Sequence, residues 1–157
     1  MPTLQALLQL LDLERRTRDE ALQALSRAEG AAGQADAQAQ ALHTYRSEYV
    51  ERWSARFREP GSVALMQCYQ GFMQRLDQAI AQQRNTVAQA RSRVDQARGA
   101  LHQNERRVAS MEKLIERRRQ AEQHQLARRE QVRTDEIAQR AHARRMAASP
   151  DHGESRL

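Results

Sequence analysis

The stretch MQRLDQAIAQQRNTVAQARSRVDQARGALHQNERRVASMEKLI, residues 73–115, decides the fold, because apolar residues recur in it every seven positions. This row consists of Met73, Ile80, Val87, Val94, Leu101, Val108 and Ile115. A second row, three positions further on, consists of Leu76, Gln83, Ala90, Ala97, Asn104 and Met111. Two rows spaced in this way predict a helix that packs in a coiled coil. The polar members Gln83 and Asn104 are expected to fix the register rather than to bind a ligand.

The turn that brings a partner to this helix is predicted at Pro60-Gly61, the only strong turn signal between Thr3 and Ser149. The predicted fold is all-α, a long two-helix antiparallel coiled-coil hairpin with an unpaired C-terminal helical extension. We expect a single domain over residues 3–148, with helix 1 over about 3–58, a turn at 59–62 and helix 2 over about 63–148. Pro2-Thr3 is a suitable N-cap region. Residues 149–157 are expected to be a disordered tail.

If the arms fold back at Pro60-Gly61, residues whose numbers add up to about 121 to 123 should face each other. The facing pairs expected are Trp53 with Cys68 or Tyr69, Tyr49 with Phe72, Tyr45 with Leu76, Leu42 with Ala79 or Ile80, Gln38 with Gln83, and Leu8 with Ile115. The first arm then runs out opposite about residue 119. Residues 119–147 should therefore project as a lone helix, roughly 45 Å long at 1.5 Å per residue.

Two glycines interrupt the first arm, in the run Gly30-Ala-Ala-Gly33. Glycine inside a helix costs about 1 kcal/mol relative to alanine. The surrounding alanines favour close packing of the two helices as the reason for these glycines, with a flexible point as the alternative.

The composition excludes several classes of protein. Aromatic residues make up 4% of the chain and apolar residues 39%, so one narrow seam can be buried but not a thick core. The five histidines lack metal-ligand spacing and no glycine-rich loop suits a phosphate, so we expect no metal, no cofactor and no enzyme activity. No membrane span and no signal peptide is apparent. The single cysteine, Cys68, suits a reducing cytosol and is expected to be a small packing residue.

The net charge of +6 permits an acidic partner. An arginine-rich coiled coil that binds nucleic acid is one alternative, although many arginines lie within helical reach of acids and the densest basic part is far from the aromatics that stack on bases. A plain dimer that pairs the 73–115 seam between chains is another.

Three segments in order resemble the flagellar export protein FliJ family. They are Tyr45-Arg-Ser-Glu-Tyr49 before the turn, Tyr69-Gln-Gly-Phe72 through Leu76-Asp-Gln-Ala-Ile-Ala-Gln-Gln83 after it, and Glu112-Lys-Leu-Ile-Glu-Arg-Arg118 leading into Arg128-Arg-Glu-Gln131 and Asp135-Glu136. The resemblance covers nearly the whole chain. The equivalent stalk protein of virulence type III secretion systems shares this architecture and is the alternative.

The resemblance implies a soluble component of the flagellar type III protein export apparatus. Such a protein is expected to be a stalk-like coiled coil that binds the hexameric export ATPase and its regulator and links them to the membrane export gate. Export chaperones are further expected partners, and no nucleic acid is expected. The implied location is cytoplasmic, peripheral at the cytoplasmic side of the inner membrane.

The resemblance also implies an export-gate patch, which consists of Gln38, Leu42, Tyr45, Tyr49, Phe72, Leu76, Ala79 and Gln83. Position 83 can be histidine in the family, so Gln83 departs from that pattern. A two-helix seam cannot fully bury two tyrosines and a phenylalanine, which favours partner binding over packing alone. For the ATPase the candidate region is the basic extension, with Arg117, Arg118, Arg119, Arg128, Arg129 and Arg133.

Overall fold

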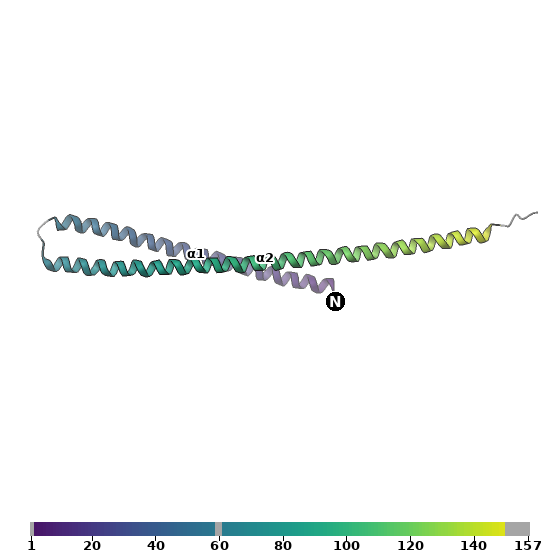
Figure 1. Cartoon of the computed structure of the whole chain (residues 1–157), viewed down its shortest axis with the longest axis horizontal. Helices are drawn as coiled ribbons and strands as arrows, with labels where there is room; N and C mark the ends of the chain where they lie inside the picture. The colour runs from purple at the N-terminus through teal and green to yellow at the C-terminus, as the bar shows by residue number, and fades with distance from the viewer. Residues whose placement is uncertain (1, 59–60, 150–157) are drawn as a thin grey trace, which may run out of the picture. The chain divides into compact units, whose positions relative to one another are not determined.

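The structure, a computed structural model, describes residues 2–58 and 61–149 and contains two helices, α1 (Leu4–Phe57) and α2 (Val63–Ala148). No strand occurs among the described residues. The two helices pack against each other as an all-α hairpin, which confirms the predicted fold class (Figure 1). Residues 59 and 60 of the expected turn, and the expected disordered tail after Ser149, lie outside the described residues.

Each helix begins at a side-chain cap. The Thr3 hydroxyl accepts a hydrogen bond from the Ala6 N–H at 3.2 Å, and the Ser62 hydroxyl accepts one from the Leu65 N–H at 3.3 Å. Both bonds satisfy an N–H that has no partner within its own helix. The Thr3 cap was expected from the sequence. The Ser62 cap was not, although serine is among the preferred residues at this position.

Contacts divide the chain into a unit of residues 11–109 and a unit of residues 1–10 with 110–157. The first is a helical hairpin in which α1 and α2 run antiparallel (Figure 1). Six members of the predicted heptad row are buried in it: Met73, Ile80, Val87, Val94, Leu101 and Val108. Full burial of a large apolar side chain is worth about 1.5–3 kcal/mol. This row is therefore the main source of the hairpin's stability, as the periodicity predicted.

α1 packs against this row with two heptad rows of its own, which were not predicted from the sequence. Within the hairpin unit every member of both rows is buried or half-buried. One row is Leu11, Arg18, Leu25, Ala32, Ala39, Arg46 and Trp53, and the other is Glu14, Ala21, Ala28, Ala35, Leu42 and Tyr49. Alanines and charged residues interrupt the apolar pattern of these rows, which hides a period that is plain in α2.

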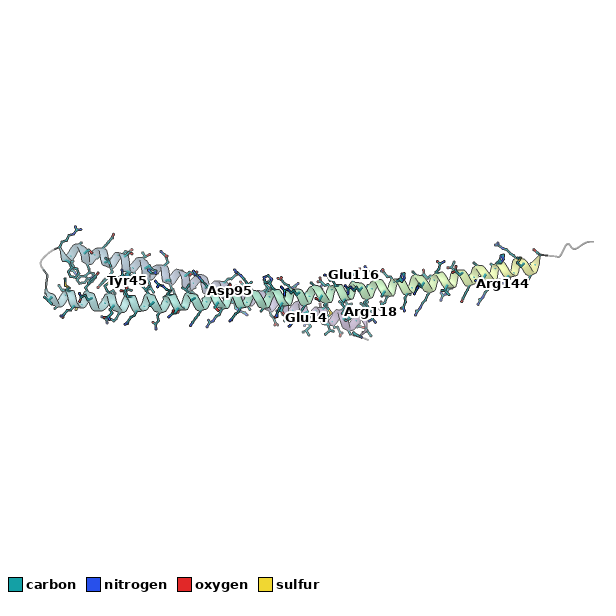
Figure 2. All side chains as sticks on the ribbon, viewed as in Figure 1. Glu14, Tyr45, Asp95, Glu116, Arg118 and Arg144 are labelled. Atoms are coloured by element: carbon teal, nitrogen blue, oxygen red, sulfur yellow. The ribbon has the colours of Figure 1, made fainter. Side chains whose placement is uncertain are left out.

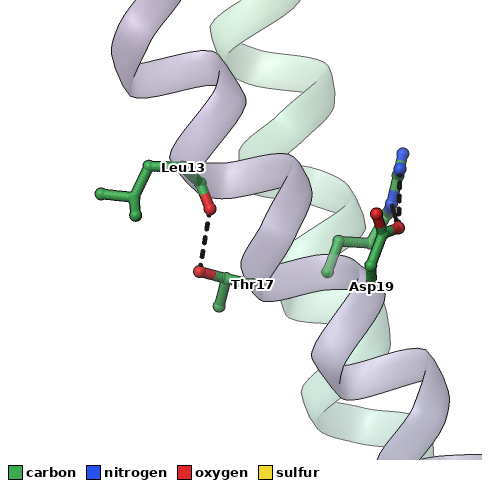
Figure 3. A network of polar contacts seen from close by, with 4 residues as sticks. Leu13, Thr17 and Asp19 are labelled. Atoms are coloured by element: carbon green, nitrogen blue, oxygen red, sulfur yellow. Dashed lines mark hydrogen bonds and ion pairs between the residues drawn. The ribbon is translucent and has the colours of Figure 1, made fainter.

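The two arginines in the α1 rows, Arg18 and Arg46, each have an acidic partner. Arg18 is half-buried at a row position, and its Nη2 lies 2.9 Å from Asp19 Oδ1 (Figure 3). The Thr17 hydroxyl, directly before Arg18, donates to the Leu13 carbonyl one turn back at 3.0 Å (Figure 3). The aliphatic stem of an arginine can cover apolar surface while its guanidinium reaches the edge of the seam. An arginine in the row thus does not leave a charge unpaired.

The register of the hairpin follows the predicted facing rule. Gln83 Nε2 donates to the Ala35 carbonyl at 3.1 Å and to Gln38 Oε1 at 3.3 Å. The rings of Tyr49 and Phe72 lie 4.4 Å apart between centroids. The polar bridge from Gln83 forms only at this register, because a slip of one residue rotates the side chain by about 100°. This geometry agrees with the register role predicted for Gln83.

The second unit joins residues 1–10 to residues 110–157. Leu7 and Ile115 are both buried in it, whereas Leu8 is exposed. The expectation that Leu8 fills this position is therefore wrong by one residue. From residue 119 to residue 148 every side chain of α2 is exposed, which confirms the predicted helical extension. Its 30 residues span about 45 Å.

Gly30 and Gly33 do not mark a close helix contact. A Cβ placed on either glycine has no neighbouring atom within 4 Å. Both residues are exposed. The expectation that tight packing requires these glycines is wrong, because the side of α1 on which they lie faces solvent.

Gly30→Ala and Gly33→Ala should each stabilise the hairpin by about 0.5–1 kcal/mol, because alanine restricts the unfolded chain and meets no obstacle in the helix. Urea denaturation followed by circular dichroism measures the change. Ala31→Gly, on the same exposed stretch, is the matched reverse change and should destabilise by a similar amount. Destabilisation by the alanine variants would show that these positions are packed after all.

Candidate partner-binding surfaces

All six aromatic residues of the chain form one cluster beside the turn of the hairpin unit. They come from the end of α1 and the start of α2: Tyr45, Tyr49, Trp53, Phe57, Tyr69 and Phe72. Neighbouring ring centroids lie between 4.4 Å and 6.3 Å apart. Aromatic pairs at such distances add about 0.5–1.5 kcal/mol beyond their burial. The cluster therefore holds the two helices firmly where no further helix covers them.

The predicted gate patch lies in this region and divides into core and surface. Leu76 is 7% exposed and belongs to the core, whereas Tyr45 is 46% exposed. Gln38 is exposed as well. The remaining members, Leu42, Tyr49, Phe72, Ala79 and Gln83, are half-buried. The structure thus brings the eight residues to one region of the hairpin, and only Tyr45 (labelled in Figure 2) and Gln38 are exposed there.

A shallow depression on α1 extends this surface toward the turn. It is lined by Tyr45, Tyr49, Arg52, Trp53 and Arg56, with Ala55 beside them. The Arg56 guanidinium carbon lies 5.6 Å from the centroid of the Trp53 ring. Arg52, Trp53 and Arg56 were not among the predicted site residues. Their spacing from Tyr45 and Tyr49, by seven or eight positions, places them on the same helix face and was the available signal.

An ion pair joins the two helices at the solvent-exposed edge of the core, beside this surface. Arg46 Nε donates to Asp77 Oδ1 at 2.7 Å. This hydrogen bond lowers the pKa of Asp77 below its ordinary value and raises the pKa of Arg46. Arg46 occupies a heptad position of α1. The positive charge that it brings into this row is therefore paired with the Asp77 carboxylate of α2.

The basic region predicted to meet the ATPase belongs to the other unit. Arg117, Arg119, Arg128, Arg129 and Arg133 are exposed there. Arg118 is half-buried and pairs with Glu122 at 3.5 Å, one helical turn away. Figure 2 shows side chains of this part of α2, with Arg118 and Arg144 labelled, pointing away from the helix axis. Five of the six predicted arginines are thus exposed, and the sixth, Arg118, is half-buried.

In the described parts of the chain, no group of three or more His, Cys, Asp or Glu residues could hold a metal ion. No helix within the described ranges is long and apolar enough to cross a membrane. Cys68 is exposed, so the expectation that it is a packing residue is wrong. It precedes Tyr69, which takes the inward position.

The hairpin has a heptad seam, an aromatic cluster beside the turn and an exposed basic helix. A comparison with known families agrees with this architecture. The profile described as Flagellar FliJ protein matches residues 3–147. The chain belongs to the FliJ family. It is therefore a coiled-coil protein of flagellar type III protein export, and its family is one of export components rather than a known family of enzymes. A search of curated proteins gave no match.

Asp77→Asn should lower the urea midpoint at neutral pH, because it removes the charged partner of Arg46. The pKa of Asp77 is depressed in the folded state, so its contribution is complete above the ordinary carboxyl pKa of 3.8 and disappears as the pH falls through the lower folded value. Asp95→Asn, at an exposed position of the same helix, is the matched control. The difference between the two variants should close in acid, and a difference that is independent of pH would contradict this assignment.

Proposed function

We propose that this FliJ-family chain is a stalk-like component that binds the hexameric export ATPase and links it to the membrane export gate. The observation that carries the proposal is that two chemically different surfaces belong to different units of the chain. One unit carries a partly exposed aromatic cluster, and the other carries a helix of 30 exposed residues rich in arginine. A location peripheral to the inner membrane, with the ATPase regulator and export chaperones as further partners, belongs to the same proposal.

Gate binding is assigned to the surface around Tyr45. Its ring lies 6.1 Å from that of Tyr49 and 6.3 Å from that of Phe72, which limits its freedom before any partner arrives. A large aromatic side chain that is exposed yet held in place loses little entropy on binding. Gln38, hydrogen-bonded to Gln83, supplies a polar group at the edge of the same surface.

ATPase binding is assigned to the exposed part of α2. A polar helix without tertiary contacts is marginal in water, so a partner that covers it also stabilises it. Arginine side chains suit carboxylates and backbone carbonyls, which a protein pore offers. Nucleic acid is a weaker candidate for these arginines, because none of the six aromatic residues lies on this part of the chain to stack on bases.

Tyr45→Ala should weaken binding to the gate's soluble domain by at least about thirtyfold, the loss expected for a hot-spot residue. Its unfolding midpoint should fall only modestly, because the side chain is 46% exposed and only its ring contacts with Tyr49 and Phe72 are lost. His43→Ala, at an exposed position two residues away, is the matched control and should bind normally. Binding is measured by isothermal titration calorimetry. Normal binding by Tyr45→Ala would remove this surface from the interface.

Leu76→Ala separates packing from recognition in the same patch. It should cost about 2–4 kcal/mol of stability, because it empties a position that is buried against Met73 and Ile80. Under conditions in which the variant remains folded, its gate affinity should be close to that of the unaltered chain. A specific loss of affinity without loss of stability would mean that Leu76 itself meets the partner.

Replacing Arg128, Arg129 and Arg133 together by glutamine should weaken ATPase binding by at least about tenfold, since each charge-assisted hydrogen bond is worth about 1.5–3 kcal/mol. The matched control replaces Arg84, Arg93 and Arg106, three exposed arginines of the hairpin unit, and changes the net charge equally. Affinity for the assembled ATPase is measured at two salt concentrations. Equal losses in both variants would indicate attraction by net charge alone.

A further inference from the structure

The start of α2 is an exposed apolar segment that the proposed function does not use. Every residue from 61 to 68 is exposed, including Val63 at 74%, Leu65 at 47% and Met66 at 47%. No charged residue occurs from position 60 to position 74, although 29% of the chain is charged. This is the longest uncharged run in the sequence. Exposed apolar side chains grouped in this way usually mark a contact surface.

The apolar side chains surround the helix instead of forming one stripe. At 100° per residue, Leu65 lies about 200° around the axis from Val63, and Met66 about 300°. A protein groove receives side chains from one face of a helix, at spacings of three, four and seven. A helix end whose exposed apolar side chains point in several directions suits a medium that is apolar on every side, which is the interior of a lipid layer.

The neighbouring end of α1 carries the residues that accompany insertion into a membrane surface. The rings of Trp53 and Phe57 lie 5.6 Å and 5.2 Å from that of Tyr69, which places the two helix ends together. Arg52, Arg56 and Arg58 are exposed on this end. Tryptophan and tyrosine concentrate at the headgroup level of bilayers, and arginine is attracted to anionic lipid.

We propose that this end of the hairpin, residues 52–58 around the end of α1 and 61–68 around the start of α2, inserts into the surface of an anionic lipid bilayer. Val63, Leu65 and Met66 enter the boundary between headgroups and acyl chains. The three arginines contact lipid phosphates. This contact goes beyond the proposed function, because it is made with lipid, needs no gate protein and does not use Tyr45.

Trp53 is the only tryptophan of the chain and lies at the proposed contact, so its fluorescence reports on this end alone. The full-length protein is mixed with vesicles of equal parts phosphatidylglycerol and phosphatidylcholine, or of phosphatidylcholine only. Bromine on the acyl chains quenches tryptophan that reaches them. We expect a blue shift and quenching with the anionic vesicles, and at least about a tenfold weaker response with the neutral ones.

The test variant replaces Val63, Leu65 and Met66 by glutamine. Its vesicle partition coefficient should fall by at least about tenfold, the loss expected when apolar side chains no longer leave water. The matched control replaces Leu126, Val132 and Ile137 by glutamine, at 58%, 57% and 61% exposure, and should partition normally. Neither variant changes the charge, and circular dichroism verifies that both keep their helices.

Two outcomes would overturn the proposal. One is sedimentation with anionic vesicles without quenching of Trp53, which would mean adsorption through the arginines of the exposed α2 helix. The other is a test variant that keeps its vesicle binding but loses the gate, which would make this end a protein contact. Tyr45→Ala should retain vesicle binding, so failure of the gate assignment and failure of the lipid assignment are distinguishable.

Discussion

The contact on which the rest of the structure depends is the burial of one apolar row of α2 against α1. Two helices can bury only one stripe each, so the seam must be economical in width and accurate in register. Val87 packs against Ala35, a large residue against a small one, which allows the helices to approach closely. Gln83 then ties its amide to the Ala35 carbonyl and to Gln38. Burial supplies the stability, and this polar bridge selects one alignment.

The narrow seam also explains where binding surfaces arise. Aromatic side chains are too large for a two-helix interface to enclose, so the six of them leave edges exposed beside the turn. Tyr45 is exposed, and the other five are half-buried. Where the apolar row ends after Ile115, α2 continues with Arg118 at the next seam position and with exposed residues beyond it. Surfaces that a globular core would cover remain available to partners here.

Prediction from sequence succeeded where a periodic pattern had one physical meaning. β-branched and other apolar residues every seven positions in α2 predicted a buried row. The turn signal at Pro60-Gly61 predicted the facing pairs Tyr49 with Phe72 and Trp53 with Tyr69. Prediction failed where the burial of residues on one helix depended on the other helix packed against it. The α1 rows contain alanines and arginines that are inward only because α2 lies against them, and Gly30 and Gly33 have open space beside them.

Within the candidate gate patch, the sequence could group the eight residues but could not predict which of them are exposed and which are buried. Leu76 and Tyr45 belong to the same group, yet one is core and the other is surface. Side-chain exposure depends on the rotation of each helix about its axis, and a difference of one residue changes that rotation by about 100°. The replacement of Leu8 by Leu7 as the buried leucine has the same cause.

The sequence by itself determined that this protein is a helical hairpin with an apolar seam, a break near Pro60-Gly61 and a basic helix that continues past the seam. Heptad periodicity and turn chemistry are local properties of the chain, so they can be read without coordinates. Only the tertiary structure decided which face of α1 is covered, that Arg46 pairs with Asp77, and which aromatic edges reach solvent. These features depend on the rotation and separation of two helices, which a one-dimensional pattern leaves undetermined.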